Sequence, residues 1–107
     1  MAFLYSVTAC FDRREVATQW IAWMDREHIA DVLESGALRA EVLLIDGDPP
    51  RAEARYEFAH RESYERYLSL HAPRLRARGQ ELFGGEGVSY ERRAGEIVLR
   101  VLGPPAP

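Results

Sequence analysis

The stretch that decides the fold spans residues 38–58 and reads LRAEVLLIDGDPPRAEARYEF. Apolar residues alternate with other residues on both sides of residues 46–50, where Asp, Gly and Pro cluster as turn formers. Folding the chain about this turn brings two pairs of opposite charge face to face, Arg39 with Glu57 and Glu41 with Arg55. Each such pair stabilises a sheet by roughly 0.2–1 kcal/mol, and a one-residue slip would lose both pairs and turn every apolar side chain to the other face. The sequence therefore predicts a β-hairpin in this register.

Upstream of the hairpin, the sequence predicts a strand and then a helix. Residues 3–11 alternate with period two, as a strand does. Asp12 follows, with Glu15 three residues further on, which is the spacing of a capped helix start. Apolar residues then recur on one helical stripe: Val16, Trp20, Trp23 and Met24. The stripe loses its phase after His28, so we expect a kink or a second short helix across residues 29–34.

Downstream of the hairpin, the pattern becomes helical and then returns to a strand. A single helix face carries Tyr64, Tyr67, Leu68 and His71. Pro73 breaks this run or starts a new turn, which predicts a further short helix after it. Residues 88–93 are expected to form the last strand, residues 94–96 a turn or bulge, and residues 97–102 an additional edge strand. Residues 104–107 are expected to be a disordered tail.

The order of these elements predicts an α+β fold of the ferredoxin-like βαββαβ type, in one domain covering residues 1–103. The two helical segments would cover one face of a four-stranded antiparallel sheet. The other face mixes Leu4, Leu43 and Ile45 with hydroxyl groups and the charged pairs, so it is too polar for a core and too apolar for water. A second copy of the chain would cover it, and we therefore expect a homodimer with two-fold symmetry.

Composition narrows the class of protein. The net charge is −3 and all 14 basic residues are Arg, so the sequence shows no basic surplus for a nucleic-acid partner. Cys10 is the only cysteine, and no apolar run approaches the roughly 20 residues that cross a bilayer. The start of the chain lacks the pattern of a signal peptide. We expect a soluble, cytoplasmic protein of bacterial type, with neither a nucleic-acid nor a membrane partner.

The chain also resembles a known family, the bacterial domain of unknown function 4286, which is similar in build to the dimeric α/β-barrel superfamily. The resemblance rests on residues spread over nearly the whole chain: Trp20, Trp23, Met24, His28, Ile29, Gly36, Tyr56, Tyr64, Tyr67, 72–76, Phe83, Gly84 and 91–93. It implies a ferredoxin-like fold and a dimer, and it assigns no activity. The superfamily includes small monooxygenases, haem-degrading enzymes, decarboxylases and stress-responsive proteins, whose ligand pockets commonly lie between the helices and the sheet.

Three histidines are candidates for chemistry. His28 ends the aromatic stripe and could act as a general base, a haem ligand or a hydrogen-bond donor to a substrate. The plainer interpretation is a helix-end histidine bonded to a backbone carbonyl. His71 follows the tyrosine face of the second helical segment and could meet His28 across a shared cavity. His60 opens that segment and reads as a surface or capping residue.

Aromatic residues either form the core or line a pocket, and the sequence leaves both open. The candidate pocket consists of Tyr5, Trp20, Met24, His28, Tyr56, Tyr67 and His71. Cys10 reads as a small buried residue, since nothing in the sequence points to an activated thiol. Arg74, Arg76 and Arg78 read as solvated surface. The sequence contains no metal-binding pair and no phosphate-binding glycine loop, so it assigns no metal and no cofactor.

Three functions follow from this interpretation, and no catalytic residue is assigned. The first is a homodimer that binds a small apolar or aromatic molecule between helices and sheet. The second is a small enzyme of the monooxygenase type, or a haem-binding enzyme, that uses His28. The third is a dimeric interaction module without a ligand. Whether the protein is an enzyme is left open by the sequence.

Overall fold

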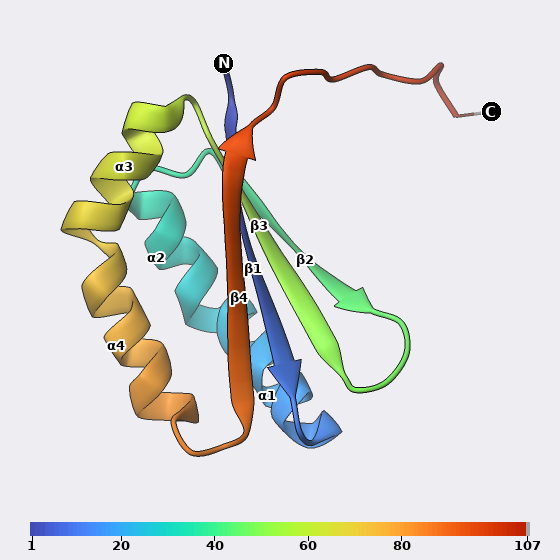
Figure 1. Cartoon of the computed structure of the whole chain (residues 1–107), viewed down its shortest axis with the longest axis vertical. Helices are drawn as coiled ribbons and strands as arrows, with labels where there is room; N and C mark the ends of the chain where they lie inside the picture. The colour runs from blue at the N-terminus through green and yellow to red at the C-terminus, as the bar shows by residue number, and fades with distance from the viewer. Residues whose placement is uncertain (107) are drawn as a thin grey trace.

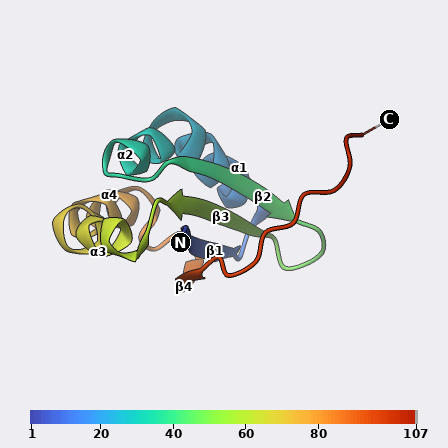
Figure 2. The same ribbon diagram turned by 90° about the horizontal axis from the view of Figure 1, so that it is seen from above.

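The computed structural model describes residues 1–106. Along the chain its elements are β1 (Phe3–Phe11), α1 (Arg14–Trp23), the π-helical segment η1 (Met24–His28), α2 (Ile29–Glu34), β2 (Arg39–Ile45), β3 (Arg51–Phe58), α3 (Arg61–Leu70), α4 (Ala72–Phe83) and β4 (Val88–Glu96). The four strands form one antiparallel sheet in the order β2-β3-β1-β4. All helices lie on the same side of this sheet, as the two views show (Figures 1 and 2). The predicted ferredoxin-like fold is confirmed.

The hairpin has the register that its charges predict. Arg39 pairs with Glu57, and Glu41 pairs with Arg55, in the ladder between β2 and β3. The side chains meet as well: the Arg39 guanidinium lies 2.9 Å from the Glu57 carboxylate, and that of Arg55 lies 3.6 Å from the Glu41 carboxylate. Because side chains alternate along a strand, this register turns the charged pairs to one face together with Leu43 and Ile45, and turns the other apolar residues to the helices.

The interruption of the apolar helical stripe after His28 has a physical cause. The backbone is helical from α1 through η1 into α2, but η1 is a π turn, which adds one residue per turn and rotates everything beyond it. This rotation brings Val32 into the core, where it is fully buried, although it lies off the Trp20 stripe of a straight helix. The expected second short helix is α2, and Gly36 follows it with φ of 122°, a conformation that glycine tolerates at a helix end.

The predicted cap of the first helix is wrong. The helix begins at Arg14, and the residue that precedes it, Arg13, makes no side-chain capping bond. Asp12 lies one residue too early to cap this start. Glu15 instead accepts a hydrogen bond from the Arg13 guanidinium at 3.0 Å. The ion pair next to the helix start replaces the expected capping box.

The end of the chain also differs from the prediction. Strand β4 continues through residues 94–96 without a turn, because its whole length pairs with β1. The expected edge strand over residues 97–102 does not form, and residues 97–106 have no regular secondary structure. The helix expected to be short after Pro73 is α4, which has 12 residues. The predicted tail at 104–107 includes Pro107, which lies outside the described residues.

The core lies between the helices and the sheet. It is built from the inward face of β1 and β3 together with the apolar stripes of α1, η1, α2, α3 and α4. Phe3, Phe11 and Phe58 are almost fully buried there. No helix among residues 1–106 is both long enough and apolar enough to span a membrane.

Candidate ligand cavity and sheet interface

A cavity of about 440 Å³ lies between the sheet and the helices. That volume falls within the range of roughly 300–1,000 Å³ that small-molecule sites occupy. Its walls come from β1, α1, η1, β3, α3, α4 and β4. The lining residues that are exposed to solvent all belong to α4 and β4: Pro73, Arg76, Ala77, Gln80, Tyr90 and Arg92. The cavity therefore opens between α4 and the edge strand β4.

Six of the seven predicted pocket residues line this cavity: Tyr5, Trp20, Met24, His28, Tyr56 and Tyr67. The seventh, His71, does not. It ends α3, and its Nδ1 lies 3.0 Å from the Arg74 guanidinium, so the expected meeting of His71 with His28 does not occur. His60 precedes α3, and its Nδ1 accepts a hydrogen bond from the Ser63 backbone N–H, as expected of a capping residue.

The aromatic residues serve both as core and as cavity wall. Tyr5, Trp20, Trp23, Tyr56 and Tyr67 line the cavity, whereas Phe58 and Tyr64 pack beside it without reaching it. The rings contact one another closely. The centroids of Tyr5 and Tyr56 are 5.9 Å apart, and those of Tyr5 and Tyr67 are 6.0 Å apart. Such packing holds the walls rigid and presents flat ring faces and hydroxyl groups to the cavity.

Tyr56 lines the cavity, and its hydroxyl group is enclosed. The residue is 1% exposed, and its Oη has no hydrogen-bond partner among residues 1–106. Burial raises the pKa of this hydroxyl, so it stays protonated and can donate. Burial likewise raises the pKa of Tyr67 to about 12. An unsatisfied buried donor costs about 1–3 kcal/mol.

His28 lines the cavity from η1 and packs against Trp23, with ring centroids 4.6 Å apart and the two ring planes tilted by 32°. Burial lowers its pKa, while the negative charges of Asp31 and Glu27 oppose that effect. The imidazole is therefore mainly neutral near pH 7 and can accept a proton. This geometry differs from the plainer interpretation, since the ring packs against an indole at the cavity wall.

A polar clamp fixes the Trp23 wall to α4. The Trp23 Nε1–H donates to Glu27 Oε2 at 3.0 Å, and Arg78 donates two hydrogen bonds to the same carboxylate at 2.9 and 3.1 Å. The Arg78 bonds, followed by the Trp23 bond, lower the pKa of Glu27 to about 2. Gly79 lies so close that a Cβ there would stand 3.4 Å from the Trp23 ring. Arg78 thus supports the cavity wall from outside, while its side chain remains 41% exposed.

Sequence reasoning missed three residues at the cavity mouth. Arg76 donates a hydrogen bond to the Tyr5 hydroxyl at 3.2 Å. The Tyr90 hydroxyl accepts one from Trp20 Nε1 at 3.2 Å, and the Arg92 guanidinium lies 5.1 Å from the centre of the Tyr90 ring. Tyr90 and Arg92 could have been predicted from the sequence, because alternate positions of β4 face the helices and both residues occupy such positions.

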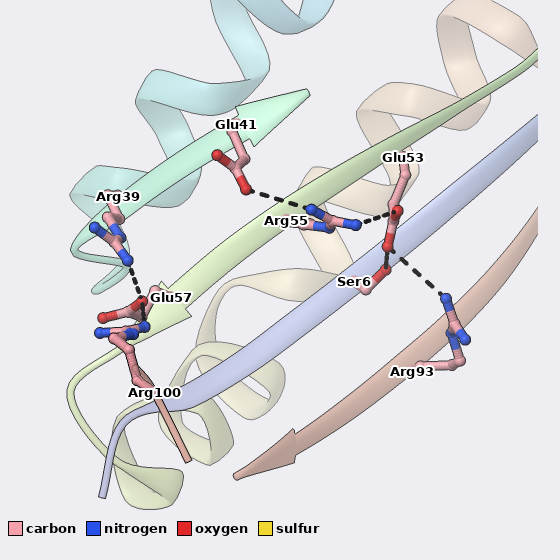
Figure 3. Close-up of polar contacts among 8 residues, drawn as sticks. All are labelled: Ser6, Arg39, Glu41, Glu53, Arg55, Glu57, Arg93 and Arg100. Carbon is pink, nitrogen blue, oxygen red and sulfur yellow. Dashed lines mark hydrogen bonds and ion pairs between the residues drawn. The ribbon is translucent and has the colours of Figure 1, made fainter. Parts of the chain in front are cut away.

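The uncovered face of the sheet carries a second polar cluster (Figure 3). Glu53 accepts a hydrogen bond from the Ser6 hydroxyl at 2.6 Å and pairs with Arg55 at 3.2 Å and with Arg93 at 3.8 Å. These contacts, the Ser6 bond foremost, lower the pKa of Glu53. Glu53 is only 8% exposed although no helix covers it.

A shallow hollow of about 630 Å³ surrounds this cluster. Its rim includes Arg100, which binds Glu57 from beyond the last strand. Apolar side chains lie on the same face, and Leu43 on β2 is 45% exposed. Beyond β4, four apolar side chains are each more than three-quarters exposed: Val98, Leu99, Val101 and Leu102. The uncovered face of the sheet thus carries both charged and apolar side chains, as the sequence predicts.

The remaining candidates for chemistry are the Cys10 thiol and a metal site. Cys10 is half-buried, so it is less enclosed than expected. Within residues 1–106, no three His, Cys, Asp or Glu side chains are grouped so that they could hold a metal ion.

The fold defines the class of the protein as a ferredoxin-like α+β domain with a cavity between its helices and sheet. The chain belongs to the family described as a domain of unknown function (DUF4286), whose model matches residues 2–97. No curated protein matches the chain significantly.

Solved structures share this fold at low sequence identity. A dimeric ferredoxin-like protein from an uncultured marine organism has a TM-score of 0.76 at 14% identity, over 96% of this chain and 100% of that chain. SnoaB, a cofactor-independent oxygenase from Streptomyces nogalater, has 0.70 at 9%, over 94% and 96%. A putative antibiotic biosynthesis monooxygenase from Deinococcus radiodurans has 0.68 at 14%, over 96% and 100%. Similarity at this level establishes the fold alone.

Proposed function

We propose that this protein is a homodimer that binds a small, largely aromatic molecule in the cavity between its helices and sheet. The observation that carries the proposal is the combination of a cavity of about 440 Å³ with the buried, unpartnered hydroxyl of Tyr56, one of its lining residues. A tightly packed core would fill such a space and would pair such a hydroxyl. The flat faces of Trp20 and Trp23 favour a planar partner.

The test uses N-phenyl-1-naphthylamine, an uncharged aromatic dye that fluoresces in apolar surroundings. Both tryptophans of the chain line the cavity, so excitation of tryptophan reports on a dye bound there. We expect saturable energy transfer from tryptophan to the dye, with one site per chain. The substitution Ala54→Phe, which adds a ring to the cavity wall, should abolish this signal.

Ala52→Phe is the matched control for that substitution. Ala52 lies on the same strand and the same face as Ala54, but it does not line the cavity. Overfilling a packed core costs about 1–3 kcal/mol, so Ala52→Phe should lower the melting temperature, whereas Ala54→Phe should leave it nearly unchanged. Absence of dye binding, together with equal destabilisation by both substitutions, would contradict the proposal and favour an interaction module without a ligand.

The dimer in this proposal forms through the uncovered sheet face. A two-fold axis through this face would set each Glu53 cluster near the arginines of the other copy, which gives charge complementarity between identical surfaces. The exposed apolar side chains beyond β4 would find cover in the same assembly. The dimeric ferredoxin-like protein of similar fold supports this proposal. We also propose a bacterial, cytoplasmic setting, as the sequence suggests.

A second candidate function is favoured by His28, a neutral base in the cavity wall. An enzyme that starts by removing an acidic C–H proton would need such a group. The test follows deuterium exchange into 2-tetralone by NMR, in which His28 would take the proton and the enolate would take up deuterium from solvent. His28→Ala should lose any acceleration, and no acceleration in the unsubstituted protein would count against this candidate. A haem titration that leaves the Soret band unshifted would argue against the haem-binding alternative.

A further inference from the structure

Two arginines at the cavity mouth have no carboxylate partner. Arg76 on α4 and Arg92 on β4 both line the opening, and neither forms an ion pair with any carboxylate of residues 1–106. By contrast, Arg78, two residues after Arg76 on α4, is bound to Glu27. Other arginines also lack a carboxylate partner, among them Arg26 and Arg66, so the distinguishing feature of Arg76 and Arg92 is that both line one opening.

No Asp or Glu lines the cavity, and its side-chain acceptors besides hydroxyl oxygens are the His28 imidazole and the Gln80 amide oxygen. Tyr5 accepts a hydrogen bond from Arg76, and Tyr90 accepts one from Trp20, which leaves both hydroxyl hydrogens available to a third partner. The Tyr56 hydroxyl has no partner among residues 1–106, but it is enclosed. At the mouth a bound molecule therefore meets the hydroxyl hydrogens of Tyr5 and Tyr90 and the guanidinium hydrogens of Arg76 and Arg92, and oxygen acceptors would satisfy them.

We infer that the ligand class is a planar aromatic acid, whose anionic oxygens face Arg76 and Arg92 while its ring lies against the cavity tyrosines and tryptophans. This inference rests on the proposed function and adds the charge of the ligand to it. Hydrogen bonds between a guanidinium and a carboxylate are about twice as strong as those between neutral groups. In a cavity closed by aromatic walls, the two positive groups select against a neutral molecule of the same shape.

The experiment compares 2-naphthoate with 2-naphthamide, which has the same shape and no charge. Binding is followed by quenching of Trp20 and Trp23. We expect the acid to bind at least about tenfold more tightly than the amide, because a carboxylate gains charge-assisted bonds that an amide does not. Arg76→Gln and Arg92→Gln should each remove most of this preference. Arg76→Lys, which keeps the charge, should retain part of it.

Arg74→Gln is the matched control, since Arg74 is exposed on the same helix and lies outside the cavity, where it contacts His71. It should leave the preference for the acid unchanged. Equal affinity for the acid and the amide, with the uncharged dye still bound, would overturn this inference and leave the proposed function standing. Failure of the acid, the amide and the dye alike would overturn both. Thermal melting of each variant separates loss of binding from loss of folding.

Discussion

Leu43→Arg is expected to convert the protein from a dimer into a monomer. Leu43 points from β2 to the uncovered sheet face and is 45% exposed in the single chain. In the proposed dimer an arginine there would lose its water and hold the two sheet faces apart, although Glu53 of its own chain lies opposite. Taking a charged side chain out of water costs several kcal/mol, and a loss of about 3 kcal/mol raises the dissociation constant by about 100-fold. Light scattering in dilute solution should then give a mass near the 12.2 kDa of one chain.

Leu44→Arg controls for the effect of a new charge on the same strand. Leu44 is the next residue and is 56% exposed, but it points to the side of the sheet that carries the helices. An arginine at position 43 faces Glu53 across the strands, so the monomer itself should tolerate it. The Leu44→Arg protein should remain a dimer. Dimers in both variants, or monomers in both, would contradict the assignment of the interface to the uncovered face.

Phe58→Ala is expected to have the largest effect on stability, a loss of about 3–5 kcal/mol. Phe58 is 0% exposed at the end of β3, and its ring packs against Tyr64 and Tyr67 of α3 at centroid distances of 5.7 and 5.5 Å. Removing the ring leaves a space that the rigid sheet and helix cannot close. Urea unfolding measures the change in the free energy of unfolding.

Leu70→Ala provides the comparison for that measurement. Leu70 lies at the end of α3 and is exposed, so its truncation should change stability by no more than about 0.5 kcal/mol. Phe58→Leu should be milder than Phe58→Ala and should keep dye binding, because Phe58 does not line the cavity. A loss below about 1 kcal/mol for Phe58→Ala would show that the aromatic layer under α3 is not a packed core.

The hairpin was predictable because its evidence is local. Two charge pairs and one turn fix a single register, and the structure has that register. The helix that follows β1 was predictable only in part. The sequence shows that the apolar stripe of this helix ends near His28. It does not show that the helix continues through a π turn, because that depends on the packing of Val32 in the core. The cap failed because a neighbouring ion pair between Arg13 and Glu15 competed with it.

The cavity wall was predictable where it follows helical or strand periodicity, and not where it depends on packing between elements. Six candidate residues share inward faces and do line the cavity. His71 failed because α3 ends there, which turns its ring to Arg74. Arg76 looks like surface in the sequence, since its contact with Tyr5 joins residues 71 positions apart. The length of β4 was missed because Gly95 suggests a turn, while pairing with β1 keeps it extended.

Methyl NMR tests the central claim, that the cavity holds an aromatic ligand, most directly. The chain has two methionines, and only Met24 lines the cavity, where it is 1% exposed; Met1 is 67% exposed. With ¹³C-methyl-labelled methionine, saturating N-phenyl-1-naphthylamine should shift the Met24 methyl signal, give Overhauser contacts between that methyl group and the dye ring, and leave the Met1 signal unchanged. A Met24 signal that does not move at saturating dye would contradict the account.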